Sequence, residues 1–277
     1  MITGKTTLIA HFGYPTESFK APMIYNPYFE QAGIDAVVVP MGVRAEDYAT
    51  VLKSVFRLTN IRGALVTMPH KVTTLALLDG CSIGVQIAGS CNAVLLRPDG
   101  TLFGDIFDGV GFVRGLQRKN LRLEGASCLV IGSGGVGSAI AAALAASGIA
   151  SIAVSDAYPD SAEGLAGRLK QHYPTLEVRT ASNDPAGFDL VVNATPLGMK
   201  AGDPLPLDIG RLAPTTFVGE VVMKQEITPL LQAAREKGCR TQIGTDMLFE
   251  QIPAYLEFFG FGTTTPDRLR AVAKIAY

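Results

Sequence analysis

The sequence predicts an α/β protein of two domains, one of which is a Rossmann-type, doubly wound parallel sheet. The chain has 277 residues, more than the roughly 100–200 residues of a typical single domain. Short β-branched runs alternate with longer helical patterns from one end to the other, which is typical of βαβ units. A glycine-rich turn, Gly132 to Gly137, separates a strand from a helix near the middle of the chain, as in nucleotide-binding domains.

The first part of the chain predicts a smaller α/β domain. Buried strands are expected at 7–10, 36–40 and 64–67, with helices at 22–31 and 45–58 between them. The first helix ends before Gly33, and the second repeats apolar residues at helical spacing. Two further strands, 92–96 and 101–105, flank Arg97-Pro98-Asp99-Gly100, a sequence that favours a hairpin turn. We expect this substrate domain to comprise residues 1–107.

The second part predicts the Rossmann-like dinucleotide-binding domain, residues 108–245. A helix at 109–119 precedes strands expected at 127–131, 151–155, 177–180, 189–193, 216–221 and 240–243. Helices fill the intervals between these strands, which favours a parallel sheet. Two last helices, 247–259 and 266–276, are followed by no strand. We therefore expect residues 246–277 to return to the first domain and complete it.

Composition excludes several classes of protein. Hydrophobic residues make up 48%, charged residues 18%, and the net charge is -1, which argues against disorder and against a basic nucleic-acid surface. No apolar run approaches the roughly 20 residues that span a bilayer, and no signal peptide is recognisable. Four cysteines and three histidines are dispersed, so neither a disulfide framework nor a metal site is predicted. We expect a cytoplasmic protein, monomeric or homodimeric, that binds a small molecule and has neither a nucleic-acid nor a membrane partner.

The glycine-rich turn predicts a dinucleotide site. Strand 127–131 leads directly into Gly132, Gly134, Gly135, Val136 and Gly137, and an alanine-rich helix follows from Ser138. Such a turn lets backbone N–H groups approach a pyrophosphate and points a helix start at it.

Asp156 ends the next strand, and no Lys or Arg lies near it. A carboxylate there accepts hydrogen bonds from the adenosine ribose and repels a 2′-phosphate, which favours NAD over NADP. The alternative is that Asp156 only opens the following turn.

Two residues have the chemistry for moving a proton. Lys71 follows a buried strand of the first domain, and Asp108 stands at the expected junction of the domains. Interconversion of an alcohol and a ketone by hydride transfer needs a group that takes or gives the hydroxyl proton. Taken alone, each side chain also fits a solvated or capping role.

Six motifs in order resemble the shikimate dehydrogenase family over nearly the whole chain. They are VTMPHK (66–71), GSCNA (89–93), GDIFDGVG (104–111), GSGGVGSA (132–139), NATPLGM (193–199) and MLFEQ (247–251). The resemblance implies that Lys71 handles the proton and that Asp108 holds Lys71 in place. It implies that Thr67, Asn92 and Gln251 bind substrate hydroxyls. It also implies that the cofactor lies against Asn193, Thr195 and Met199, with Gly244 nearby, and that the substrate is a shikimate- or quinate-like cyclic alcohol.

The departures from the family lie in the expected substrate pocket. Phe19 and Ala21 occupy the places of two serines that hold the substrate carboxylate, Leu65 replaces an Asn and Met223 a Tyr. Losing two hydrogen bonds to a charged group, at about 1.5–3 kcal/mol each, would weaken shikimate binding by orders of magnitude. Ser18 or Lys20 would have to substitute for them.

We therefore expect a related cyclic alcohol that is altered or less acidic at the carboxylate end. The run Ser155-Asp156-Ala157 lacks the Arg that grips a 2′-phosphate in shikimate-specific members. In this respect the chain resembles the NAD-using quinate or shikimate branch.

Other readings stay open. A non-catalytic protein that binds a metabolite on the same fold would keep the architecture without turnover. Short-chain dehydrogenases need Tyr-x-x-x-Lys, which no tyrosine here provides. A lactate-type enzyme would need a catalytic His, for which only His70 is a candidate. A folate-linked methylene dehydrogenase would also pair a lysine with two domains.

Overall fold

The structure, a computed structural model, describes residues 2–17 and 19–275. Its chain divides into two compact units. Unit 1 comprises Met1–Val85, Gly89–Phe107 and Ile252–Tyr277, and unit 2 comprises Gln86–Ala88 and Asp108–Gln251. The return to unit 1 begins at Ile252, later than the residue 246 expected from the sequence.

Unit 1 contains a six-stranded sheet of order β2-β1-β3-β5-β6-β4. Its strands are β1 (Thr7–Gly13), β2 (Ala36–Gly42), β3 (Ile61–Val66), β4 (Gly80–Cys81), β5 (Ala93–Leu96) and β6 (Leu102–Asp105). β1 pairs in parallel with β2 and β3, whereas β3–β5 and β5–β6 are antiparallel. The sheet is therefore mixed, because the Arg97–Gly100 turn returns the chain directly alongside β5 and Gly100, at φ 85°, closes it with an N–H···O bond of 3.0 Å to Arg97.

The helices of unit 1 include pieces that the sequence pattern missed. The helices of unit 1 are α1 (Pro22–Ala32), α2 (Tyr48–Val55), the 3-10 turn η1 (Thr73–Leu77) and α9 (Pro266–Val272). Helix α3 (Ile83–Ala88) contains residues of both units. Neither η1, α3 nor the two-residue β4 is long enough to show a hydrophobic period. α1 ends at Gly33, whose φ of 67° forms the left-handed cap that glycine tolerates.

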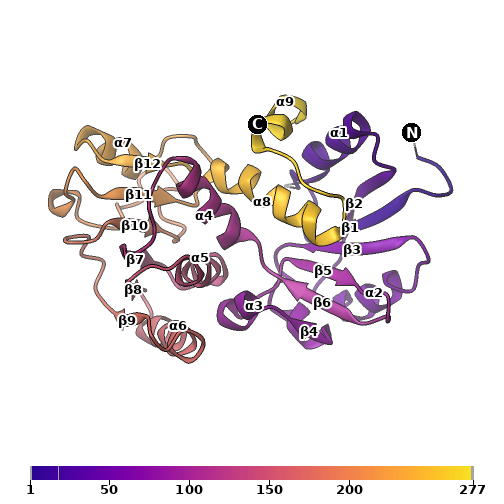
Figure 1. The fold of residues 1–277 in the computed structure, drawn as a ribbon, viewed down its shortest axis with the longest axis horizontal. Helices are drawn as coiled ribbons and strands as arrows, with labels where there is room; N and C mark the ends of the chain where they lie inside the picture. The colour runs from indigo at the N-terminus through magenta and orange to yellow at the C-terminus, as the bar shows by residue number, and fades with distance from the viewer. Residues whose placement is uncertain (1, 18, 276–277) are drawn as a thin grey trace. The chain divides into compact units, whose positions relative to one another are not determined.

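Aromatic packing ties the C-terminal helices to the sheet of unit 1. The ring of Phe259 lies so close to β3 that a Cβ added at Gly63 would sit 2.5 Å from it. Arg62 donates from Nε to the carbonyl of Phe259 at 2.8 Å. Tyr255 packs edge-on against Phe107 with ring centroids 4.7 Å apart. Figure 1 shows the second half of α8 and the helices α1 and α9 around this sheet. The last helices are thus part of the core of unit 1.

Unit 2 contains a six-stranded sheet, all of whose neighbouring strands are parallel, in the order β12-β11-β10-β7-β8-β9. The strands are β7 (Ser127–Ile131), β8 (Ser151–Ser155), β9 (Glu177–Thr180), β10 (Leu190–Asn193), β11 (Phe217–Glu220) and β12 (Arg240–Gln242). The chain starts in the middle at β7, proceeds outward to β9, and then crosses to β10 on the other side. The topological switch point therefore lies between β7 and β10, where Rossmann folds bind their ligands.

Helices cover both faces of this sheet, as a doubly wound fold requires. They are α4 (Asp108–Arg118), α5 (Gly135–Ala146), α6 (Pro159–His172), α7 (Pro229–Glu236) and the short turn η2 (Ile209–Arg211), with α8 (Gly244–Phe259) shared between the units. Cys128 and Val130 of β7 face the core under α4, α5 and α6. Leu129 and Ile131 face the opposite core under α7. This alternation along one strand buries both faces of the sheet, and Figure 1 shows the helices of this unit around its strands.

The longest element of the described chain is the 16-residue helix α8. In the described ranges, 2–17 and 19–275, no helix has both the length and the apolar content needed to cross a membrane.

Candidate cofactor and substrate sites

The three motif glycines of the turn between β7 and α5 have different surroundings. Gly132 has a φ of 101°, and a Cβ there would lie 2.9 Å from the backbone of Ala194 on the neighbouring loop. A Cβ at Gly137 would lie 2.0 Å from the carbonyl oxygen of Gly132. A Cβ at Gly134 would meet no described atom within 4 Å. The turn is therefore closed against the protein at its ends and open at Gly134, where a ligand can approach the backbone.

Helix α5 begins earlier than the sequence analysis expected. Its first residue is Gly135 and its N-cap is Gly134, whereas the expected start was Ser138. Propensity disfavours glycine inside a helix, but the packing of Gly137 against the turn overrides it. As a result Gly135, Val136 and Gly137 lie in the first turn of α5, where unpaired N–H groups can bind an anion.

Asp156 lies at the end of β8 beside this turn. Its Oδ2 accepts hydrogen bonds from the N–H of Ser133 at 2.6 Å and from Ser133 Oγ at 2.7 Å. Its Oδ1 accepts the N–H of Tyr158 at 2.9 Å. Partial burial acts to raise the pKa of this carboxyl, but the bonds from Tyr158 and Ser133 together outweigh it and lower the pKa below the ordinary value. The group at this position is a fixed, ionised carboxylate.

The loop after β10 is organised by Asn193, whose side chain is fully buried. Its Oδ1 accepts from the N–H and the hydroxyl of Thr195, and its Nδ2 donates to the carbonyl of Leu197 and to Glu220. Burial raises the pKa of Glu220, against hydrogen bonds from Thr228 and Asn193. Because both ends of its amide are used, Asn193 shapes the loop and does not present its own side chain to a ligand.

Further along, this loop and the start of α8 present other predicted residues. Met199 is 46% exposed and follows Gly198, whose φ is 101°. Gly244 opens α8, and a Cβ there would lie 2.2 Å from the carbonyl oxygen of Val222. Met223, which follows Val222 in the chain, is 37% exposed. These residues belong to the same unit as the glycine turn, and Gly244 is required by packing.

In unit 1, three predicted site residues lie around the carboxyl end of β3. Thr67 follows β3 and donates its N–H to the carbonyl of Phe12 at 2.9 Å. The carbonyl of Lys71 accepts the N–H of Cys91 at 2.8 Å, and Asn92 accepts the N–H of Val66 through its carbonyl at 2.8 Å. The structure therefore brings the chain at Thr67, Lys71 and Asn92 together, although they are separate in sequence. Asn92 is buried, and its Oδ1 also accepts the N–H of Phe107 at 3.0 Å.

His70, the candidate for a lactate-type mechanism, has a structural role. Its Nε2 bonds to the carbonyl of Val43 at 2.8 Å, and its ring stacks on Tyr48 with centroids 3.9 Å apart. The Tyr48 hydroxyl lies 2.8 Å from Thr74 Oγ1, which in turn donates to the carbonyl of His70. This closed, buried network uses the imidazole to hold the loop that carries Lys71.

Phe19 is the residue for which the family resemblance implied a carboxylate-binding serine. It is 8% exposed, and its ring stacks on His11 with centroids 4.1 Å apart. A Cβ added at Gly13 would lie 2.7 Å from the Phe19 ring and 2.4 Å from the side chain of Thr67. The Phe19 ring therefore lies next to the predicted substrate residue Thr67.

Two residues on the strands beside the Phe19 ring, His11 and Leu65, are buried and carry no charge at pH 7. His11 is buried, and burial lowers the pKa of its imidazole to about 4, so the ring is neutral at pH 7. Its Nδ1 has no hydrogen-bond partner in the described part of the chain. Leu65, which pairs with His11 across β1 and β3, is also buried.

The residues beside Phe19 differ in what they can offer a substrate. Ala21 is the N-cap of α1 and offers no side-chain bond, and Lys20 is half-buried. The predicted residue Ser18 lies outside the described residues.

Asp108 and Gln251 belong to unit 2. Asp108 is the first residue of α4 and is buried. A Cβ added at Gly111, one helical turn later, would lie 2.6 Å from the Cβ of Gln251. Gln251 is 9% exposed, and among the described residues its Oε1 has no hydrogen-bond partner. A buried amide oxygen without a partner costs stability, so Gln251 suits a ligand hydroxyl.

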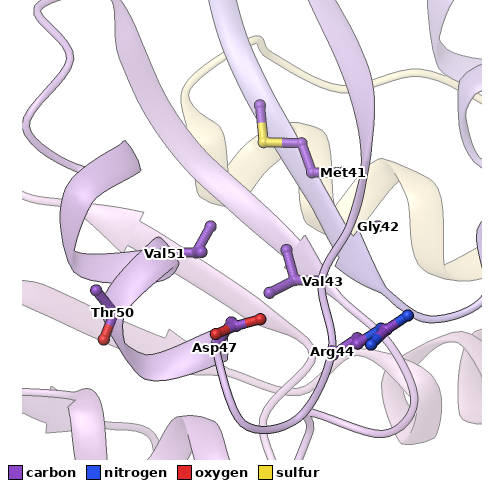
Figure 2. A pocket seen from close by; sticks show the side chains of 7 residues that line it. All are labelled: Met41, Gly42, Val43, Arg44, Asp47, Thr50 and Val51. Atoms are coloured by element: carbon purple, nitrogen blue, oxygen red, sulfur yellow. The ribbon is translucent and has the colours of Figure 1, made fainter.

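A separate hollow in unit 1 contains none of the predicted site residues. It has a volume of about 650 Å³ and is lined by Met41, Gly42, Val43, Arg44, Asp47, Thr50 and Val51. Figure 2 shows Asp47, Thr50 and Val51 on one side of it, from α2 and the turn before it. Its lining meets the loop of Lys71 through Val43, whose carbonyl bonds to His70.

Two residues of the sites were not singled out from the sequence. Ser133 stands at a variable position of the glycine motif, and His11 stands in an apolar strand. A polar residue inside a buried strand was a signal for His11. The role of Ser133 had no signal, because it depends on the turn that brings it to Asp156.

The two units together define a nucleotide-binding α/β protein of the dehydrogenase type, and comparison with known proteins specifies which one. Residues 12–94 match the family model for the shikimate dehydrogenase substrate binding domain. A shikimate dehydrogenase (NADP(+)) from Rubrobacter xylanophilus is 35% identical over 254 residues, which cover 90% of this chain and 89% of that protein. The chain belongs to the shikimate dehydrogenase family.

Solved structures agree with this assignment over the whole chain. A shikimate 5-dehydrogenase from Listeria monocytogenes, in complex with shikimate and NAD, has a TM-score of 0.91 and 27% identity, covering 98% of this chain and 97% of that one. The ligand-free 5-ketofructose reductase of a Gluconobacter species has a TM-score of 0.89 and 26% identity, covering 98% and 99%. The fold thus occurs in proteins that are named for shikimate and for 5-ketofructose.

Proposed function

We propose that this protein is an oxidoreductase that interconverts a secondary alcohol and a ketone of a cyclic polyhydroxy substrate with a nicotinamide cofactor. The observation that carries the proposal is the glycine turn, which is closed at Gly132 and Gly137 and open at Gly134. A pyrophosphate needs such an opening at a helix start. Membership of the shikimate dehydrogenase family supports the same chemistry.

Within that reaction, Lys71 and Asp108 are the proposed catalytic residues. The cofactor, when bound, accepts or supplies the hydride. Lys71 Nζ takes the hydroxyl proton when the alcohol is oxidised and returns it when the ketone is reduced, and the Asp108 carboxylate orients the ammonium group. The hydrogen bonds of His70 and Cys91 hold the backbone on both sides of Lys71. Thr67, Asn92 and Gln251 bind substrate hydroxyls.

The proposed substrate lacks a carboxylate where shikimate has one. Phe19 and Ala21 provide no hydroxyl there, and the imidazole of His11 under Phe19 is neutral. Burying a carboxylate against such a surface without partners is costly. The structural relative that is named for 5-ketofructose, a sugar ketone without a carboxylate, supports this choice.

The proposed cofactor is NAD. The Asp156 carboxylate stands at the end of β8 with a lowered pKa, so it is ionised at pH 7 and repels a 2′-phosphate. No Lys or Arg occurs between Asp156 and Arg168, and Arg168 donates to the carbonyl of Ile87. The relative from Rubrobacter is named for NADP(+), whereas the structure from Listeria is a complex with NAD, so the proposal rests on Asp156 of this sequence.

A matrix of substrates and cofactors tests the proposal. Shikimate, quinate and neutral cyclic polyols or sugar ketones are assayed with NAD(H) and NADP(H). We expect the highest kcat/KM for a neutral substrate with the NAD couple, and efficient turnover of shikimate would refute the substrate class. If shikimate is used, Lys20→Met shows whether Lys20 replaces the two serines, because turnover of shikimate would then fall.

Variants at the catalytic positions separate an enzyme from a binding protein. Lys71→Ala should reduce kcat by at least about 100-fold, the usual size of a lost acid–base group, while the cofactor still binds. Asp108→Asn should also reduce kcat, and its effect on kcat should be larger than its effect on cofactor affinity. A wild-type protein that binds these ligands without turning any of them over would instead support a metabolite-binding role.

A further inference from the structure

The Asp156 carboxylate is anchored by the glycine turn itself. Both donors of Ser133, the backbone N–H at 2.6 Å and Oγ at 2.7 Å, bind the same oxygen, Oδ2. Oδ1 takes a different partner, the N–H of Tyr158 at 2.9 Å. Because its two oxygens are held by different groups, the carboxylate cannot rotate without breaking a charge-assisted hydrogen bond.

This arrangement makes the two oxygens unequal. A carboxylate oxygen has about two lone pairs for hydrogen bonding, and Ser133 uses both of those on Oδ2. Oδ1 has no bond from Ser133; it accepts the N–H of Tyr158, and the N–H of Ala157 is a further donor to the carboxylate. Asp156 is partly exposed, whereas Ser133 is buried. A ligand hydroxyl therefore reaches the carboxylate through Oδ1.

We propose that Ser133 is a positioning residue for cofactor selection: its hydroxyl fixes Asp156 so that Oδ1 faces the unphosphorylated adenosine ribose of NAD. This inference rests on the NAD preference proposed above. A carboxylate that is held in place also cannot turn aside for a 2′-phosphate, so the Ser133 hydroxyl contributes to the rejection of NADP as well as to the binding of NAD. The opposite role is that Ser133 Oγ turns to donate to a 2′-phosphate, which would favour NADP.

The experiment measures dissociation constants of NAD and NADP for the full-length protein and four variants, Ser133→Ala, Ser133→Thr, Asp156→Ala and Ser147→Ala. Ser147 is the control, because its Oγ donates only to the carbonyl of Ala143 at the far end of α5. Ser133→Ala should weaken NAD about tenfold, as expected for one hydrogen bond to a charged group, with NADP affinity unchanged or improved. Ser133→Thr keeps the hydroxyl and should restore most of the NAD affinity.

A second readout distinguishes positioning from a general structural role. The Ser133 hydroxyl is one of the donors that lower the pKa of Asp156. In Ser133→Ala the pH at which NAD affinity falls on acidification should therefore move upward, and in Ser147→Ala it should not. If Ser133→Ala fails to fold, Ser133→Cys, which keeps the size but is a weak donor, is measured in its place.

The outcomes separate this inference from the function on which it rests. If wild type prefers NAD, Asp156→Ala abolishes that preference and Ser133→Ala does not change it, the Ser133 inference is overturned while the NAD assignment stands. A larger loss of NADP than of NAD in Ser133→Ala also overturns it. A wild-type preference for NADP overturns both.

Discussion

Replacing Phe19 and Ala21 with serines should raise the efficiency with which the protein turns over shikimate. The double variant Phe19→Ser/Ala21→Ser places serines where the family has them, and the single variant Phe19→Ala is its matched control. Phe19→Ala removes the same ring from above His11 but adds no donor. The comparison between these two variants therefore isolates the hydroxyls from the space.

The expected magnitude follows from the chemistry of the pocket. Each hydrogen bond to a charged group contributes about 1.5–3 kcal/mol. Two such bonds total about 3–6 kcal/mol, and about 1.4 kcal/mol corresponds to a factor of ten. The double variant should exceed Phe19→Ala in kcat/KM for shikimate by about 100-fold or more, with the upper end reduced by residual strain. Both variants lose a buried ring, which typically costs about 3–5 kcal/mol of folding free energy.

The assay follows reduced cofactor by absorbance at saturating NAD, with shikimate varied and folding checked by thermal melting. Both variants must melt cooperatively at the assay temperature for the comparison to count. A neutral substrate from the panel should show little difference between the two variants, because the serine hydroxyls have no carboxylate to bind. Equal shikimate efficiency in two folded variants would refute the argument that Phe19 and Ala21 set the substrate charge.

Three further predictions concern other parts of the molecule. Gly137→Ala should destabilise the fold by about 1–3 kcal/mol, because its Cβ meets the Gly132 carbonyl. Gly134→Ala should leave the melting temperature unchanged and weaken cofactor binding. Equal effects of the two variants on the melting temperature and on the dissociation constant of the cofactor would contradict these roles. Burial lowers the pKa of His11 to about 4 from 6.5, so its neutral form contributes stability that is complete above pH 6.5 and is lost as the pH falls toward 4. Denaturant unfolding of His11→Leu should accordingly show a shallower pH dependence in this window, by up to about 1.4 kcal/mol per pH unit, and parallel curves would disprove it. Asn193→Ala should lower the free energy of unfolding by about 2–4 kcal/mol, because it removes the bonds of the Asn193 amide to Thr195, Leu197 and Glu220. Asn183→Ala, which breaks one partly buried bond to Pro206, should cost less in the same denaturation experiment, and an equal cost would contradict this role of Asn193.

The sequence by itself determined the class of fold and the place of the cofactor turn. The strands β7 and β8 have the bounds that their β-branched runs predicted, because strands inside a parallel sheet are buried on both faces and form continuous apolar segments. The edge strand β9 also has its predicted bounds, although only Val178 in it is buried. The glycine spacing marked the turn, since a Cβ would clash with the backbone at Gly132 and at Gly137. Family membership was also readable, because its motifs lie at the ends of strands in a fixed order.

Tertiary structure alone decided how side chains at those positions are used. Pairing of β5 with β3 made the first sheet mixed, and short pieces such as β4 have no periodic signal. Asn193 was predicted at the cofactor from sequence, whereas only the structure shows its amide bonding to Thr195, Leu197 and Glu220. The stacking of Phe19 on His11 and the bonds of Ser133 to Asp156 join residues that are distant in sequence. Hydrophobic period and turn chemistry are local properties that a sequence displays directly, whereas these partnerships depend on how separate segments meet in the folded chain.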